Sequence, residues 1–149
     1  MFRGQFEHAV DAKGRTSLPS RFRDALAADN DLRVVLTRAL DEPCLHLYAM
    51  KGWEELEAKV AQMPQFDPNV VAFRRLYLSA AIECEIDKQG RILVPPSLRE
   101  HAELTKDVLW AGMGKTAELW SKDRWLAVQS LSKAQLSELK TAMLERFRL

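Results

Sequence analysis

The sequence repeats itself at an offset of 76 residues, and this repeat constrains the fold more than any other feature. The segment DAKGR at residues 11–15 returns as DKQGR at residues 87–91, with Asp, Gly and Arg at the same spacing. The similarity begins earlier, because FEHAV (6–10) matches IECEI (82–86) with inward-type residues at every second position. This alternation is typical of a half-buried β-strand. One small chain therefore carries two copies of one folding unit.

The match continues downstream with small gaps. RVVLT (33–37) aligns with DVLWA (107–111), and CLHLY (44–48) aligns with AELWS (117–121). Each half is predicted to contain a strand, a tight turn, a strand, a short helix, two further strands and a helix. We assign the chain to four parts: repeat 1 (5–53), inter-repeat helices (54–80), repeat 2 (81–125) and a C-terminal helix (126–149).

The repeated turn explains its own Asp and Gly. Gly14 and Gly90 suit the positive φ that a tight hairpin turn requires. The side chains of Asp11 and Asp87 can accept hydrogen bonds from amides of their own turns. We therefore predict a structural role for these four residues.

The remaining turn residues are free for another role. Lys13 and its counterpart Gln89 are predicted to project from the tips of the turns. Arg15 and Arg91 begin the return strands, where each can pair with the Asp of its turn or reach outward.

Helix signals lie between and after the repeats. Ser97 and Glu100 have the spacing of a capping box, and Asp67-Pro68 predicts an N-cap with proline in the first helical turn. A last helix is predicted after Ser132, with one apolar face that needs a partner: Leu136, Leu139, Met143 and Phe147.

Composition limits the functions that the chain can have. With 149 residues, 47% hydrophobic and 29% charged, the chain is globular and too short for a large multidomain enzyme. A net charge of +1 excludes an indiscriminate polycation, so any nucleic-acid binding must come from a local patch. There is neither a signal peptide nor a membrane span, which predicts a soluble cytoplasmic protein without a membrane partner. Cys44 and Cys84 form no metal motif and are expected to be reduced and buried.

The sequence contains no complete catalytic or cofactor-binding motif. AGMGKT (111–116) resembles a phosphate-binding loop, but the required first glycine is replaced by Leu109 and a strand is expected to follow. The carboxylates of Glu83, Glu85 and Asp87 share a strand face, but no histidine joins them by spacing. The three histidines fit no catalytic triad or metal motif. We therefore predict no enzyme activity, no metal site and no cofactor.

The basic segment KGRTSLPSRFR (13–23) is the strongest functional signal that the residues give. Charge alone is typical of a solvated surface, but a rigid hairpin can enter the major groove of DNA, which admits a two-stranded ribbon. The second copy has Gln89 in place of Lys13 and is less basic. The first hairpin is therefore the better DNA candidate, and the second is the better structural candidate.

Two segments of the chain resemble the MraZ family, bacterial proteins with two AbrB/SpoVT-type half-repeats. They are MFRGQFEHAVDAKGRTSLPSRFR (1–23) and the segment from Cys84 to Trp120. The resemblance implies an α+β fold, a swapped-hairpin β-barrel in which the two halves of one chain form a pseudo-dimer. It also implies a nucleoid-associated transcriptional regulator that forms octameric or dodecameric rings. Such a regulator binds repeated promoter boxes in double-stranded DNA and represses its own division and cell wall gene cluster. Carried over by position, the resemblance implies that Lys13 and Arg15 contact the DNA and that Arg91 contributes less.

Two other functions stay open at the level of sequence. The same barrel can serve as an antitoxin-like or scaffold module that binds a protein and not DNA. A small metal-dependent hydrolase that uses Glu83, Glu85 and Asp87 would contain bound metal. Salt-sensitive, sequence-selective retention on DNA would distinguish the regulator from the scaffold, and elemental analysis for metal would test the hydrolase.

Overall fold

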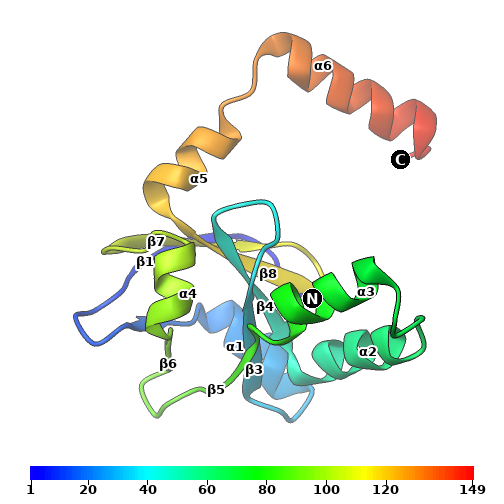
Figure 1. Cartoon of the computed structure of the whole chain (residues 1–149). Coiled ribbons are helices and arrows are strands. Elements are labelled where there is room, and N and C mark those ends of the chain that lie inside the picture. Colours follow the sequence, from blue (N-terminus) through cyan, green and yellow to red (C-terminus); the bar gives the residue numbers. More distant parts are fainter.

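The computed structural model describes residues 1–149, and the predicted order of elements occurs twice (Figure 1). The first half contains β1 (Gln5–Ala9), β2 (Arg15–Ser17), α1 (Ser20–Ala28), β3 (Arg33–Arg38), β4 (Cys44–Ala49) and α2 (Met50–Ala61). The second half contains β5 (Ile82–Glu85), β6 (Arg91–Leu93), α4 (Pro96–His101), β7 (Asp107–Gly112), β8 (Thr116–Ser121) and α5 (Lys122–Gln129). The additional helices are α3 (Pro68–Phe73) with the π-helical turn η1 (Arg74–Leu78), and α6 (Lys133–Thr141) with the π-helical turn η2 (Ala142–Arg146).

The two halves exchange their first strands. In the six-stranded antiparallel sheet the order is β1-β7-β8-β4-β3-β5, so β1 pairs with β7 of the second half and β5 pairs with β3 of the first. The short strands β2 and β6 pair with each other in a separate ribbon. This exchange confirms the predicted α+β fold, a swapped-hairpin barrel closed by two half-repeats of one chain.

An approximate twofold axis relates the halves. In the ribbon, Thr16 lies opposite its own repeat counterpart Ile92. In the large sheet, β4 and β8 are neighbours and His46 lies opposite Glu118. The axis therefore passes through the centre of the ribbon and through the centre of the large sheet.

The structure corrects one step of the repeat alignment. Val34 lies opposite Ala49, and its counterpart Val108 lies opposite Ser121, so residues 44–49 correspond to residues 116–121. The alignment of 44–48 with 117–121 was wrong by one residue. Leu119, Trp120 and Ser121 are all buried, so the end of β8 lacks the alternation of buried and exposed residues by which strands are aligned.

The core is shared by both halves. Phe22 of α1 and Trp110 of β7 are fully buried, and their rings meet edge to face at a centroid distance of 6.1 Å. Phe2 and Phe6 contact the same Phe22 ring at 5.1 and 5.5 Å. The indole N–H of Trp110 donates to the carbonyl of Ser17 at 3.1 Å. This bond ties the end of the β2–β6 ribbon to the most buried part of the molecule.

The helix caps agree with the sequence at one site and differ at another. Asp67 caps α3 as predicted and accepts hydrogen bonds from the amides of Asn69 and Val70. The capping box predicted for Ser97 is wrong, because α4 already begins at Pro96 and Ser97 lies inside its first turn. Helix α6 has the capping box instead, formed by Ser132 and Gln135.

The C-terminal segment projects from the barrel as an arm, which we define as residues 126–149 (Figure 1). Every residue from 126 to 141 is exposed, including Leu136 and Leu139 at 50% each. Two of the boundaries expected from the sequence fall inside helices: the boundary between residues 53 and 54 lies within α2, and the boundary between 125 and 126 lies within α5. None of the helices is both long enough and apolar enough to cross a membrane.

Candidate nucleic-acid interface

The first repeated turn is held together by Asp11. Its Oδ1 accepts hydrogen bonds from the amides of Lys13 and Arg15, both at 2.9 Å, and its Oδ2 accepts from Nε of Arg15 at 2.8 Å. Gly14 adopts φ of +89°, which confirms the expected left-handed position. The hydrogen bond from the Arg15 amide, together with its side chain, keeps the pKa of Asp11 below its usual value. The carboxylate therefore stays charged and holds the guanidinium in one orientation.

The second turn repeats this geometry. The Oδ1 of Asp87 accepts from the amides of Gln89 and Arg91 at 2.8 and 2.9 Å, and its Oδ2 accepts from Nε of Arg91 at 3.0 Å. Gly90 has φ of +77°. The pKa of Asp87 is lowered for the same reason, with the Arg91 amide as the largest cause. The predicted structural roles of the four Asp and Gly residues agree with these contacts.

The ribbon presents both arginines on one face. Thr16 and Ile92 are each 1% exposed and point into the core, so their neighbours Arg15 and Arg91 point outward. Because Arg15 lies opposite Leu93, the two arginines are diagonal neighbours, roughly 7 Å apart at Cβ. Each uses only its Nε in a side-chain bond to the Asp of its turn. The terminal nitrogens of both guanidinium groups make no hydrogen bond to the protein and are available to a ligand.

Two further arginines reach across from the opposite half. The guanidinium group of Arg99 lies over Gly14, so closely that a Cβ there would come within 2.8 Å of its central carbon. The counterpart Arg23 lies over Gly90 in the same way, and its Nε donates to the carbonyl of Leu18 at 3.2 Å. The sequence shows Arg23 and Arg99 as a matched pair, but it does not show that each lies against the other half's turn.

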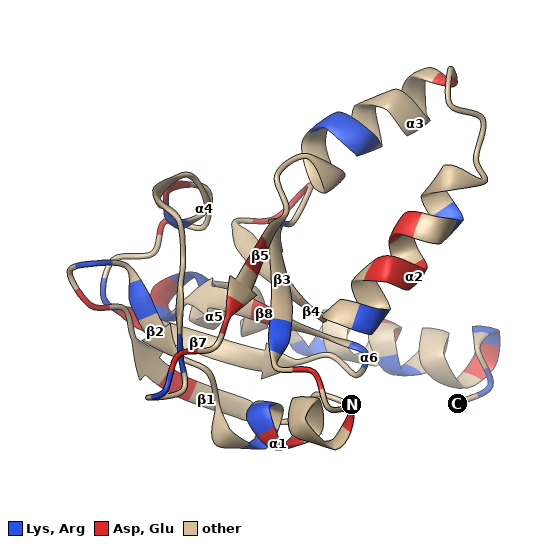
Figure 2. Cartoon of the chain, turned by 90° about the horizontal axis from the view of Figure 1, so that it is seen from below, with Lys and Arg blue, Asp and Glu red and all other residues tan.

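Because Arg99 lies beside the first turn and Arg23 beside the second, the two turns have similar numbers of basic residues around them. The first turn is surrounded by Lys13, Arg15 and Arg99, and the second by Lys88, Arg91 and Arg23. Lys88 takes the place of Ala12 and compensates for the change from Lys13 to Gln89. The expectation of a clearly less basic second turn therefore does not hold in three dimensions. Figure 2 shows Lys and Arg around β2 and at the turns beside it.

The motifs that resemble phosphate-binding or catalytic sequences have ordinary places in the fold. The segment 111–116 leads directly into strand β8, where a phosphate-binding loop would need a helix. Glu83 forms an ion pair with Arg33 at 3.3 Å. Asp87 is committed to its turn, so the three carboxylates of this strand do not converge on one site. Cys44 and Cys84 are free thiols and buried, as expected.

Comparisons with known proteins agree with the repeat. A family model described as "MraZ protein, putative antitoxin-like" matches the chain twice, at residues 1–76 and 77–147. A relative from Thermoanaerobacter sp. is 46% identical over 125 residues, which cover 84% of each chain. A relative from Acetivibrio thermocellus is 43% identical over 147 residues, covering 97% of this chain and 99% of its own. A third, from Alkaliphilus metalliredigens, is 41% identical over 145 residues.

All three relatives are described as "Transcriptional regulator MraZ". The double match of the family model reproduces the division into two halves that the sheet and the turns display. Two family matches that together span nearly the whole chain, and relatives above 40% identity over most of it, lead to one conclusion. The chain belongs to the MraZ family.

Proposed function

We propose that this protein is a sequence-specific DNA-binding transcriptional regulator and that the β2–β6 ribbon is its DNA contact. The observation that carries the proposal is the pair of matched turns, each with an Asp-held arginine on the outer face of one ribbon. Membership in a family whose relatives are described as transcriptional regulators supports it. Lys13, Arg15 and Arg91 are the proposed contact residues.

The shape and chemistry of the ribbon suit the major groove. That groove is about 12 Å wide and admits a two-stranded β-ribbon. A guanidinium group presents a planar fork of donors that can bind a guanine edge or a phosphate through two hydrogen bonds. Because Asp11 and Asp87 fix the Nε end of Arg15 and Arg91, the free ends point outward with little entropy left to lose. The orientation of the forks is therefore set before DNA arrives.

Assembly into a ring would compensate for the small size of one contact. Each phosphate that is neutralised changes the slope of log affinity against log salt by about −0.9, so one ribbon with few contacts binds weakly. When several ribbons on one assembly meet several promoter boxes, the later contacts become intramolecular, which raises avidity by roughly 10² to 10⁴. A chain with a net charge of only +1 can then bind its operator selectively.

We assign the subunit contact to the arm. Leu136, Leu139 and Phe147 follow a helical spacing and are 50%, 50% and 63% exposed. An apolar helical face of this kind is stable in water when another surface covers it. A second copy of the chain offers a matching surface at α3 and η1.

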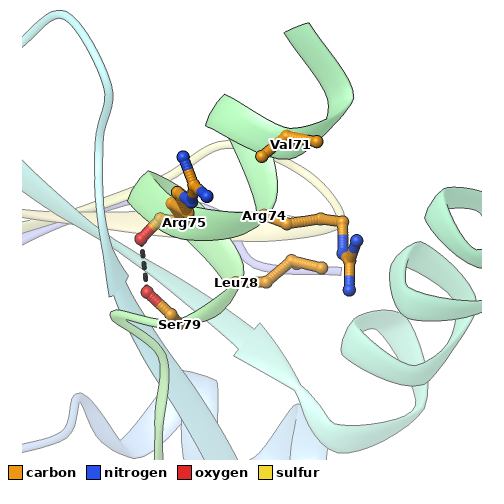
Figure 3. Close-up of a pocket in the computed structure, with 5 residues that line it drawn as sticks. All are labelled: Val71, Arg74, Arg75, Leu78 and Ser79. Atoms are coloured by element: carbon orange, nitrogen blue, oxygen red, sulfur yellow. Dashed lines mark hydrogen bonds between the residues drawn. The ribbon is translucent and has the colours of Figure 1, made fainter. Parts of the chain in front are cut away.

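That surface is a shallow hollow of about 540 Å³ lined by Val71, Arg74, Arg75, Leu78 and Ser79. In Figure 3 the Arg74 side chain extends alongside Leu78, whereas Arg75 points away from the other side of the turn. The proposed contact rests on apolar packing of Val71 and Leu78 against the leucines of the arm, because the arm carries four basic residues besides Glu138 and Glu145. Octameric or dodecameric rings remain the proposed assemblies.

The proposed target is DNA upstream of the protein's own gene, within a division and cell wall gene cluster, where tandem boxes would allow several subunits to bind. The proposed action there is repression. The protein would then reside in the cytoplasm, associated with the nucleoid. The proposed DNA contact consists of side chains alone and uses no cofactor.

Two observations favour a second function. The family model is described as antitoxin-like, and the exposed arm offers an apolar helix to a protein partner. A scaffold of this kind would have no use for outward guanidinium groups on a rigid ribbon. DNA binding by an assembled ring accounts for both features, the ribbon as the DNA contact and the arm as the subunit contact.

The test is a band-shift titration with the duplex just upstream of the reading frame and a shuffled duplex of equal length. We expect binding to the upstream duplex that weakens with salt, and loss of that binding in Arg15→Ala. Lys59→Ala, which removes an exposed lysine from α2, is the matched control and should bind like the wild type. Light scattering should give the same assembly size for all three proteins. Absence of binding to the upstream duplex would favour the scaffold function, and equal binding to both duplexes would contradict sequence-specific recognition.

A further inference from the structure

A cluster of side chains that could ligate a metal ion lies on the outer face of the large sheet, opposite the ribbon. Cys44 and His46 of β4 and Glu118 of β8 each offer one ligand atom, and these atoms all lie within 4.8 Å of one another. His46 and Glu118 are direct cross-strand partners, with Nε2 of His46 3.7 Å from Oε2 of Glu118. Neither the DNA contact nor the arm uses these residues.

Bonds from neighbouring residues orient two of the three side chains. The Nδ1 of His46 is 2.7 Å from the hydroxyl of Tyr77, so Nε2 is the nitrogen that faces Glu118. The Oε1 of Glu118 accepts from the indole N–H of Trp120 at 3.0 Å, which leaves Oε2 toward His46. Metal-binding histidines and carboxylates are usually held by such outer hydrogen bonds. A chain of bonds therefore fixes both ligand atoms on the side where they meet.

Burial and charge favour a cation at this point. Cys44 is 0% exposed, and the side chains of His46 and Glu118 are 27% and 14% exposed. The carboxylates of Glu118, Glu42 and Asp41 lie close enough to the Cys44 thiol to act on its charge. A divalent cation at this point would neutralise their negative potential.

The ligand types select the metal. One thiolate, one imidazole and one carboxylate suit Zn²⁺, which binds them at about 2.0 to 2.3 Å in a tetrahedral arrangement. Ligand atoms in such a site are separated by about 3.3 to 3.8 Å, so the present spacing needs a contraction of about 1.5 Å at most. Three protein ligands leave the fourth position to water. Calcium and magnesium prefer all-oxygen sites and would not use Cys44.

We propose that Cys44, His46 and Glu118 form a Zn²⁺ site that fastens the two half-repeats together. Cys44 and His46 belong to the first half and Glu118 to the second, and the site lies where the twofold axis crosses the sheet. When the metal binds, the thiol of Cys44 releases its proton to solvent and the Zn–S bond forms. The consequence is a stronger junction between β4 and β8, on the wall of the barrel opposite the proposed DNA contact.

The experiment is a titration of the metal-free protein with Co²⁺, the spectroscopic substitute for Zn²⁺. We expect one Co²⁺ per chain, the intense visible bands of a tetrahedral site, and a sulfur-to-cobalt charge-transfer band that Zn²⁺ abolishes. Cys44→Ser should lose the charge-transfer band, and Glu118→Gln should weaken binding at least tenfold. Glu118→Gln retains the acceptor for Trp120 and nearly the same volume, so its fold should be preserved.

Cys84→Ser is the matched control, because Cys84 is the other buried thiol and has no histidine beside it in a metal cluster. This variant should bind Co²⁺ like the wild type. Zn²⁺ should also raise the unfolding temperature of the wild type and of Cys84→Ser, but much less that of Glu118→Gln. Absence of stoichiometric Co²⁺ binding, or a charge-transfer band that persists in Cys44→Ser, would overturn the proposal.

Discussion

Replacement of Gly14 by alanine tests whether the turn geometry stabilises the barrel. Gly14 has φ of +89°, and a Cβ at this position would lie 3.0 Å from the backbone carbonyl oxygen of Val94 and 2.8 Å from the Arg99 guanidinium carbon. The guanidinium group is flexible and can move, but the Val94 carbonyl belongs to the backbone of the other half. The same backbone contributes the hydrogen bond from the Val94 amide to the carbonyl of Gly14, at 2.8 Å.

The expected cost follows from these contacts. A non-glycine residue in the left-handed region costs roughly 1–2 kcal/mol. A displaced turn would weaken the Val94 bond, worth about 1 kcal/mol. The smaller conformational entropy of alanine in the unfolded chain offsets about 0.4–1 kcal/mol. We therefore expect Gly14→Ala to lower the free energy of unfolding by about 2 kcal/mol and Tm by about 4–8 °C, as scaled for a chain of this length.

Gly52→Ala is the matched control because it adds the same methyl group inside α2. Its nearest neighbour would be a ring carbon of Tyr48 at 4.0 Å, which is ordinary contact. Alanine is the better helix former, so this variant should be about 0.5–1 kcal/mol more stable than the wild type. Urea unfolding at one fixed protein concentration compares the three proteins under the same contribution from assembly. A Gly14→Ala protein as stable as the wild type would refute the turn's role.

Three further predictions concern the arm, the half-buried His46 and the turn. Replacement of both Leu136 and Leu139 by Asp should reduce the assembly size measured by light scattering. The free energy of unfolding should stay within about 0.5 kcal/mol, as is usual for substitutions at exposed sites. An unchanged assembly size would exclude the arm as the subunit contact. His46 has its pKa lowered below 6.5 by burial, so the unfolded chain binds more protons as pH falls and stability should decrease between pH 7.5 and 5.5 in chelator-treated protein. His46→Gln should flatten that dependence, and an equally steep profile would show that His46 does not cause it. Asp11→Ala should raise affinity for shuffled DNA through the added net charge but lower the ratio of specific to non-specific affinity, because Arg15 loses its fixed orientation; an unchanged ratio in the band-shift assay would argue against pre-orientation.

The repeat and its period predicted most of the fold. Strand positions, the left-handed glycines and the Asp-capped turns follow from local residues, because each depends on contacts within about five positions. The exchange of strands does not follow from local residues, because β1 contacts β7 more than 95 positions away. The resemblance to a known family supplied it. The slip in β8 arose where burial on both faces removed the alternation.

The candidate site was predicted only in part. Arg15 and Arg91 were identified because they recur at a fixed distance from an Asp. The positions of Arg23 and Arg99 depend on the swap, which places each helix beside the turn of the other half. The Cys44, His46 and Glu118 cluster joins residues from two strands that are more than 70 positions apart, so no spacing motif could indicate it.

The binding of operator DNA by Arg15→Ala and Arg91→Ala, measured side by side over a range of salt concentrations, tests the central claim most directly. The matched turns predict similar losses of affinity for both variants, at least tenfold, since a good bidentate interaction is worth about 1–3 kcal/mol. If the arginines bind phosphate, the salt slope should also become shallower by about 0.9 for each phosphate that the variant no longer neutralises. Wild-type affinity and an unchanged salt slope in both variants, with assembly intact, would contradict the ribbon as the DNA contact.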